Sequence, residues 1–208
     1  MEQYGIEAVL NAHYKYQSCL QFASLQNSDP SLVWFLLAKG ADPNGVNIKG
    51  WETPLVAASK SGMLPIIDIL LAYRADASLF YSHALREVYP GSYELQRKVA
   101  RKLLQHGADP DATDPNSDDE VMRKSPFMHA VYKMKLGLVR ELAKWKETIP
   151  SIEEKDIQLE ESLKRHSGRN RYLSQIRVEI KNGENERQQL LGNSLRIKWI
   201  MLKVPSQK

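Results

Sequence analysis

The segment that decides the fold is GADPNGVNIKGWETPLVAA, residues 40–58. Gly40 follows an apolar run, at the position where a left-handed residue that ends a helix is least costly as glycine. At the other end of the segment, Thr53 can cap a helix and Pro54 suits its first position, where a missing N–H does no harm. The segment therefore predicts the end of one helix, an extended connection and the start of the next helix.

Both ends of this segment recur along the chain. The Ala-Asp pair returns at residues 75–76 and Gly-Ala-Asp at 107–109, so that the aspartates at 42, 76 and 109 are 34 and 33 residues apart. A leucine-rich pair precedes each of them, and the Thr-Pro start returns as Ser125-Pro126, with a weaker copy at residues 18–23. Such a period indicates stacked repeats, each of which buries its apolar face only against its neighbours. Arg74 replaces the glycine in the middle repeat, so we expect a strained or differently shaped helix end there.

Taken together, these motifs resemble the ankyrin repeat over residues 17–146. The resemblance implies a mainly α fold, in which pairs of antiparallel helices are joined by projecting β-turn fingers and form a curved stack. Two departures stand out. Val56 occupies the fourth position of the family's Thr-Pro-Leu-His motif, and His83-Ala84-Leu85 is a poor copy of that motif in the third repeat.

The domain organisation follows from where the motifs begin and stop. We expect an N-terminal capping helix at residues 1–16 and repeats over 17–149, divided at about 17–49, 50–81, 82–123 and 124–149. Residues 150–208 form a basic C-terminal extension, either a cap on the stack or a small helical subdomain. Within 170–204 the pattern favours a helix, and a short β-hairpin turning at Asn182-Gly183 is the alternative.

The net charge of +4 is unevenly placed along the 208 residues. Residues 151–208 carry twelve Lys/Arg against eight Asp/Glu, and the segment 164–181 has six basic residues and one acid, Glu179. The single cysteine, Cys19, suits a reducing compartment. The N-terminus shows no signal-peptide pattern and the apolar runs are too short for a membrane span. We therefore expect an intracellular, cytoplasmic protein.

The sequence contains no constellation typical of an enzyme, such as a Gly-rich phosphate loop, a nucleophile elbow or a cluster of metal ligands. We expect no catalytic activity, cofactor or metal. The acidic finger at 109–124 lacks the central glycine of a calcium loop and contains prolines, so it predicts a solvated insertion. His129 is expected in the core or bonded to the backbone. Arg97, Lys98, Arg101 and Lys102 are expected on a solvated helix face, and a weak site for an acidic partner is the alternative.

The resemblance implies a non-enzymatic protein–protein interaction module or adaptor that binds through the fingers and the first-helix face. The residues expected to bind the protein partner are Asn47, Ile48, Lys49, Trp51, Phe80, Tyr81, Asp114, Asp118 and Asp119. By analogy, short ankyrin-like proteins with added tails include secreted bacterial effectors that act in the cytosol of a host cell. The alternative function is that the basic tail, chiefly residues 164–181, docks on an anionic membrane or on nucleic acid.

Overall fold

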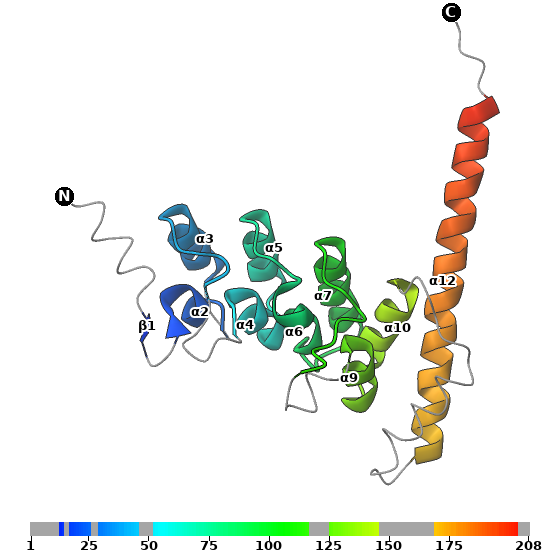
Figure 1. The fold of residues 1–208 in the computed structure, drawn as a ribbon, viewed down its shortest axis with the longest axis horizontal. Helices are drawn as coiled ribbons and strands as arrows, with labels where there is room; N and C mark the ends of the chain where they lie inside the picture. Colours follow the sequence, from blue (N-terminus) through cyan, green and yellow to red (C-terminus); the bar gives the residue numbers. More distant parts are fainter. Residues whose placement is uncertain are drawn as a thin grey trace, which may run out of the picture.

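A computed structural model of the chain describes residues 13–14, 17–25, 29–45, 52–116, 125–145 and 169–203, and in the last of these ranges the side chains of residues 174–192. Within these residues the fold is mainly α-helical. Helical hairpins stand side by side along the molecule, and one long helix lies across the far end of the row (Figure 1). The predicted stack of helical hairpins with a helical C-terminal extension is confirmed.

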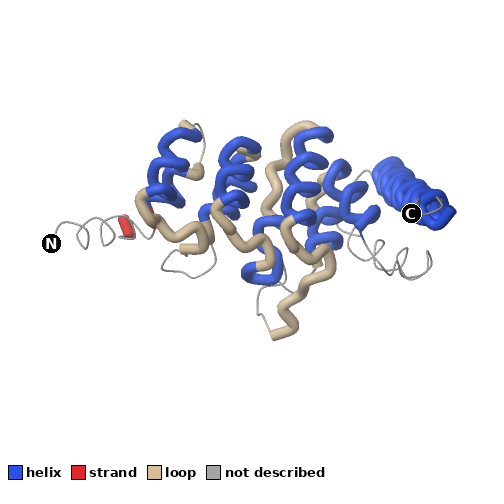
Figure 2. Tube along the Cα trace, turned by 90° about the horizontal axis from the view of Figure 1, so that it is seen from above, coloured by secondary structure: helices blue, strands red, loops and turns tan. Residues whose placement is uncertain are grey.

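Each hairpin pairs two antiparallel helices. The pairs are α2 (Cys19–Ala23) with α3 (Pro30–Ala38), α4 (Pro54–Ser61) with α5 (Leu64–Ala72), α6 (Leu79–Arg86) with α7 (Tyr93–Gln105), and α9 (Pro126–Tyr132) with α10 (Leu136–Trp145). The first helices of successive hairpins pack on one another, and so do the second helices, which gives two layers (Figure 2). One continuous apolar core runs between these layers and includes Leu55, Ile67, Leu85, Leu103 and Leu138, each at most 1% exposed.

The helices begin where the sequence predicts caps. The Thr53 hydroxyl accepts a hydrogen bond from the Val56 N–H at 3.2 Å, and the Ser125 hydroxyl accepts one from the Met128 N–H at 3.3 Å. Ser18 makes a reciprocal capping box with Gln21 at the start of α2. These side chains satisfy backbone donors that the first turn of a helix leaves without partners.

The same helix ending recurs in three repeats. The N–H groups of Ala41, Ala75 and Ala108 donate to the carbonyls of Leu36, Leu70 and Leu103 at 3.0, 2.9 and 3.0 Å, which is the Schellman arrangement. The residue before each alanine is left-handed, with φ of 95° at Gly40 and 92° at Gly107. Arg74 is also left-handed, with φ of 65°. The prediction of a strained helix end at this arginine is therefore confirmed.

The described residues before α2 do not form the predicted N-terminal capping helix. His13–Tyr14 form β1, which pairs antiparallel with β2 (Gln17–Ser18) in the register His13 to Ser18 and Tyr14 to Gln17. Ser18 ends this pair and is also the N-cap of α2, with the extended backbone angles φ −74° and ψ 159° that an N-cap residue adopts. The other residues of 1–16 lie outside the described residues.

The C-terminal extension contains one long helix, α12 (Arg169–Lys203), of 35 residues. The alternative of a β-hairpin at Asn182-Gly183 is wrong, because both residues lie inside this helix. Gly183 is buried there, and its place in α12 lets the helix approach the backbone of α10 closely. α12 packs mainly against α10 and covers the end of the stack (Figures 1 and 2). Residues 150–168 lie outside the described residues.

Candidate protein-binding surface

The described parts of the fingers, residues 42–45, 76–82 and 109–116, form what we call the finger edge. The first aspartate of each finger folds back on its own backbone. Its Oδ1 accepts a hydrogen bond from the N–H two residues further on, which is that of Asn44 at 2.9 Å, Ser78 at 2.8 Å and Asp111 at 2.8 Å. The repeated Ala-Asp motif thus sets the same tight turn at the base of every finger.

Hydrogen bonds also join each finger to the next. The Asn44 side chain accepts from the Asp76 N–H at 2.8 Å, and the Ser82 hydroxyl accepts from the Asp109 N–H at 2.8 Å. The Arg86 guanidinium extends the series by donating to the carbonyl of Ala112 at 2.5 Å. A row of turns tied together in this way is ordered before a partner arrives, which lowers the entropic cost of binding.

The second finger contains the least usual backbone in the described chain. Phe80, Tyr81 and Ser82 are all left-handed, with φ of 51°, 55° and 57°. Non-glycine residues in this region cost energy, and such strain is found mainly where a functional constraint holds it. Here Ser82 is buried and holds the third finger, while the Tyr81 side chain stays 42% exposed.

The structure places three of the predicted binding residues. Tyr81 is exposed, Phe80 is partly buried, and Asp114 is partly buried with its carboxylate accepting from the Asn116 N–H at 3.0 Å. Phe80 and Tyr81 belong to the strained start of α6, and Ser82 brings them beside the third finger. The remaining predicted residues, Asn47, Ile48, Lys49, Trp51, Asp118 and Asp119, lie outside the described residues.

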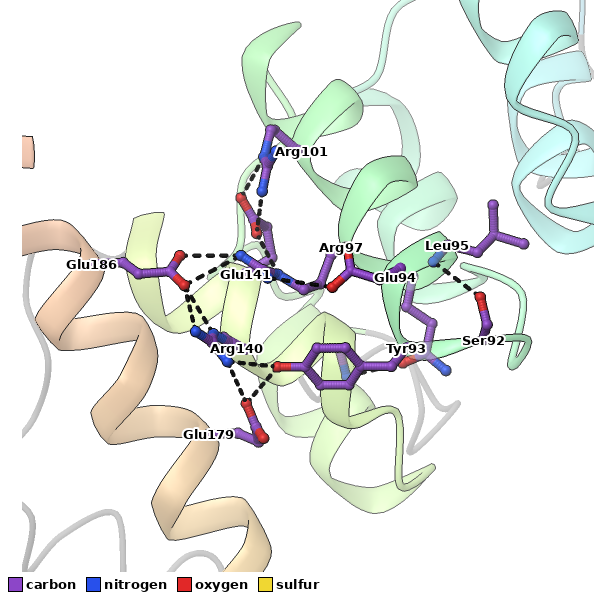
Figure 3. Close-up of polar contacts among 12 residues, drawn as sticks. Ser92, Tyr93, Glu94, Leu95, Arg97, Arg101, Arg140, Glu141, Glu179 and Glu186 are labelled. Atoms are coloured by element: carbon purple, nitrogen blue, oxygen red, sulfur yellow. Dashed lines mark hydrogen bonds and ion pairs between the residues drawn. The ribbon is translucent and has the colours of Figure 1, made fainter.

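A buried carboxylate links the last two hairpins. Glu141 of α10 is fully buried and receives Arg101 of α7 in a paired contact, with Nε at 2.9 Å and Nη2 at 3.1 Å (Figure 3). Arg97 Nε lies 3.3 Å away and Lys144 Nζ 3.6 Å away. Burial opposes ionisation, but the hydrogen bonds from Arg101 and the charges of the three cations outweigh it and lower the pKa of Glu141.

The same network holds α12 against the stack. Arg140 of α10 donates to Glu186 of α12, with Nη2 at 2.6 Å and Nε at 3.0 Å (Figure 3). The Tyr93 hydroxyl donates to Glu179 at 2.6 Å and accepts from Arg140 at 3.0 Å. Burial and the bond to Glu179 raise the pKa of Tyr93, so the phenol keeps its proton and its donor role. The apolar part of the contact comes from Ile176 and Ile180, which are 0% and 9% exposed.

This network corrects the prediction of a solvated basic face on α7. Arg97 pairs with Glu141 and Glu186 and Arg101 pairs with Glu141, whereas Lys102 pairs with Asp68 at 2.6 Å. The side chains of Arg101 and Lys102 stay 41% and 40% exposed, so the face is partly solvated but its cations are ion-paired within the chain. The signal in the sequence was Glu141, which falls on the apolar stripe of α10 between Leu138 and Leu142. A buried acid at such a position requires cations from a neighbouring helix.

A second polar cluster is buried at the turns that join the helices within hairpins. His129 is 3% exposed with Nδ1 3.1 Å from the Arg86 carbonyl, so its predicted core and backbone-bonded role is confirmed. Burial and the charge of Lys135 lower the pKa of His129 to about 4. The hydrogen bond with His83, helped by Lys60 and Lys135, lowers the pKa of Glu87 to about 2. The cluster adds polar contacts between α6 and α9 to the apolar packing of the two helices.

The first hairpin exposes an apolar surface that the sequence did not single out. Phe22, Leu32, Trp34 and Phe35 are between 47% and 67% exposed. Lys39 lies over the Phe35 ring, with its Nζ 5.7 Å from the ring centre. These residues belong to the terminal hairpin, which has a neighbouring hairpin on one side only. These exposed side chains lie on α2 and α3 and are distinct from the finger edge.

Neither a metal site nor a membrane span is found where the chain is described. The described residues contain no group of three or more His, Cys, Asp or Glu side chains that could hold an ion. Among the described helices, none combines the length and the apolar content that a bilayer crossing needs.

Stacked helical hairpins with hydrogen-bonded fingers define the class of the protein as a helical-hairpin repeat solenoid. Residues 20–114 match the family model for ankyrin repeats in three copies, so this region consists of ankyrin repeats, as its motifs predict. The hairpin of α9 and α10 follows the matched region and stacks in the same way. No curated protein matches the sequence. Ankyrin repeats are in general protein–protein interaction modules and typically carry no enzymatic activity.

Proposed function

We propose that this protein is a non-enzymatic adaptor that binds a partner protein through the finger edge and the adjoining first-helix face. The observation that carries the proposal is the left-handed turn at Phe80–Ser82, which holds Tyr81 42% exposed in the middle of a hydrogen-bonded row of fingers. Tyrosine is among the residues that contribute most to binding at protein interfaces. A strained backbone that presents such a side chain is better explained by a partner than by stability.

The charge of the finger edge indicates the kind of partner. Asp42, Asp76, Asp109 and Asp111 are exposed along the edge, and the ion-paired basic residues of α7 belong to the α7–α10–α12 network instead. A partner with a basic surface around a pocket for an aromatic ring fits this edge best. Because exposed charges are screened by salt, the association rate should fall as the ionic strength rises.

The test is affinity capture from a eukaryotic cell lysate with the full chain, Tyr81→Asn and Met134→Asn. Asparagine tolerates a left-handed backbone, so both variants keep the local conformation. Met134 is a matched control: its φ is 59°, its side chain is 51% exposed, and it lies in a hairpin turn at the opposite end of the helices from the fingers. We expect Tyr81→Asn to capture at least about 10-fold less partner protein than the natural chain, as for the loss of an interface anchor. Met134→Asn should capture as much partner as the natural chain. Equal capture by all three chains would refute the finger-edge assignment.

We also propose that the protein acts in a reducing intracellular compartment, which is the host cytosol if it is a secreted effector. The support is compositional, since Cys19 is its one cysteine and is exposed. Fractionation of cells that express the tagged full chain tests this, and recovery of the chain in the secretory pathway would contradict it.

A further inference from the structure

The first hairpin exposes a leucine at a position that later repeats bury. The residue nine positions before the alanine of each Schellman ending is Leu32 in α3, Ile66 in α5 and Val99 in α7. Ile66 and Val99 are 0% exposed, whereas Leu32 is 47% exposed. Within the described residues, α5 and α7 each pack on the second helix of the hairpin before them, and α3 has no such neighbour. The exposure of Leu32 therefore marks the side where a preceding hairpin would lie.

Phe35 lies on the same side of α3. It stands six residues before the Schellman alanine, as Lys102 does in α7, and Lys102 pairs with Asp68 of the hairpin before it at 2.6 Å. The position thus faces the preceding hairpin, and in α3 it leaves Phe35 50% exposed. Trp34 differs, because it shares its position with Asp68 and Arg101, whose side chains pair with the hairpin that follows them.

α2 adds a third exposed side chain to this side. Phe22 lies four residues after the N-cap of α2, as His129 does after the N-cap of α9. The His129 Nδ1 lies 3.1 Å from the Arg86 carbonyl of the preceding hairpin, so this position also faces backwards along the row. His129 is 3% exposed, whereas Phe22 is 67% exposed. We call Phe22, Leu32 and Phe35 the end face.

The N-terminal segment of the chain enters at this end of the stack. β1 begins at His13 and pairs with β2, which ends at Ser18, the N-cap of α2. Both views place β1 beside α2 at the outer end of the row (Figures 1 and 2). Residues 1–12 would span roughly 18 Å as a helix and about 40 Å when extended, and the 9 residues of α3 span roughly 14 Å. The segment is therefore long enough to cross the end face in either conformation.

The composition of residues 1–12 fits the end face. Ile6, Val9 and Leu10 supply apolar side chains, and both charged residues of the segment are glutamates, at positions 2 and 7. The charge beside the end face is positive, because the Lys39 Nζ lies 5.7 Å from the centre of the Phe35 ring. A second copy fits less well. Both copies would bring Lys39 to the contact, and a stable interface uses about 20–30 residues on each side.

We propose that residues 1–12 fold over the end face and close this end of the stack, as α12 closes the other. The apolar side chains of the segment remove those of the end face from water, and its glutamates are attracted to Lys39. A repeat stack needs covered ends, because an open end exposes the apolar surface on which a further repeat would stack. The closed end leaves the finger edge as the surface that meets a partner.

The test is amide hydrogen exchange of the full chain and of Leu32→Gln. In the natural chain, we expect residues 1–12 to exchange at least about 10-fold more slowly than a synthetic peptide of the same sequence. Leu32→Gln should lose this protection. The matched control is Leu191→Gln, because Leu191 is also 47% exposed and lies on α12, at the other end of the stack, so this variant should keep the protection. Unchanged exchange in α5 and α7 checks that the variants keep the fold.

Three results would overturn the proposal. The first is exchange of residues 1–12 in the natural chain at the rate of the free peptide. The second is equal protection of this segment in Leu32→Gln and in the natural chain. The third is a dimer in light scattering that Leu32→Gln dissociates, because a second copy would then cover the end face. None of these results bears on the finger edge, whose test uses Tyr81 and Met134.

Discussion

Replacing Gly183 by alanine should weaken the attachment of α12, although alanine is the better helix former. In a free helix, glycine to alanine stabilises by about 1 kcal/mol. At Gly183 the added methyl would lie 2.5 Å from the Arg140 carbonyl oxygen, 2.9 Å from the Ala143 Cβ and 3.2 Å from the Lys144 nitrogen. Two of these neighbours are backbone atoms and cannot rotate away, so α12 has to move as a whole.

The expected magnitude follows from two opposed effects. Overpacking of this kind costs about 1–3 kcal/mol. A shift of α12 also lengthens the Arg140 to Glu186 and Tyr93 to Glu179 hydrogen bonds, which are each 2.6 Å. After the gain in helix propensity is subtracted, we expect Gly183→Ala to lower the free energy of unfolding by up to about 2 kcal/mol.

Urea unfolding gives the change in stability, and amide hydrogen exchange along α12 shows where it acts. Gly192→Ala is the matched control, because Gly192 lies in the same helix and nothing comes within 4 Å of a Cβ added there. That variant should be as stable as the natural chain or more stable by up to about 1 kcal/mol. If Gly183→Ala were stabilised to the same extent as Gly192→Ala, with unchanged exchange in α12, the close packing of α12 on α10 would be refuted.

Two further substitutions test the energetics of the stack. Arg74→Gly should raise the free energy of unfolding by roughly 0.5–1 kcal/mol, because glycine adopts the left-handed φ of 65° without strain; an unchanged or lower urea midpoint would contradict this. His129→Gln should flatten the loss of stability in acid. The pKa of His129 falls from 6.5 to about 4 on folding, so its contribution is complete above pH 6.5 and is lost as the pH falls toward 4, up to about 3 kcal/mol. Unfolding titrations at pH 7 and pH 4 measure it, and parallel losses in both chains would rule out this role. Glu87 is expected to add a second loss below pH 4.5, because its pKa is about 2 in the folded protein.

The repeats could be predicted because their signals are local. Thr53 and Ser125 cap helices through their own neighbours in the chain, and Gly40 and Gly107 end helices by their own backbone freedom. Each motif determines its local structure through residues close to it in the chain. The spacing of 33 and 34 residues between successive motifs then predicts a stack of repeats.

The features that could not be predicted depend on contacts between distant segments. From their own helix, Arg97 and Arg101 are expected to be solvated, and only the approach of Glu141 from α10 makes them ion-pair partners of a buried acid. The sequence Asn182-Gly183 is typical of a turn. The role of Gly183 in close helix packing depends on α10, some 40 residues earlier in the sequence. The left-handed turn at Phe80–Ser82 likewise depends on the bond from Asp109 to Ser82.

The most direct measurement of the central claim is amide hydrogen exchange of the full chain, alone and bound to the captured partner. The account predicts new protection in residues 76–82 and 109–116, together with the adjoining first helices α4 and α6. Protection confined to the second-helix layer of α3, α5 and α7, with the finger edge exchanging as in the free chain, would contradict it.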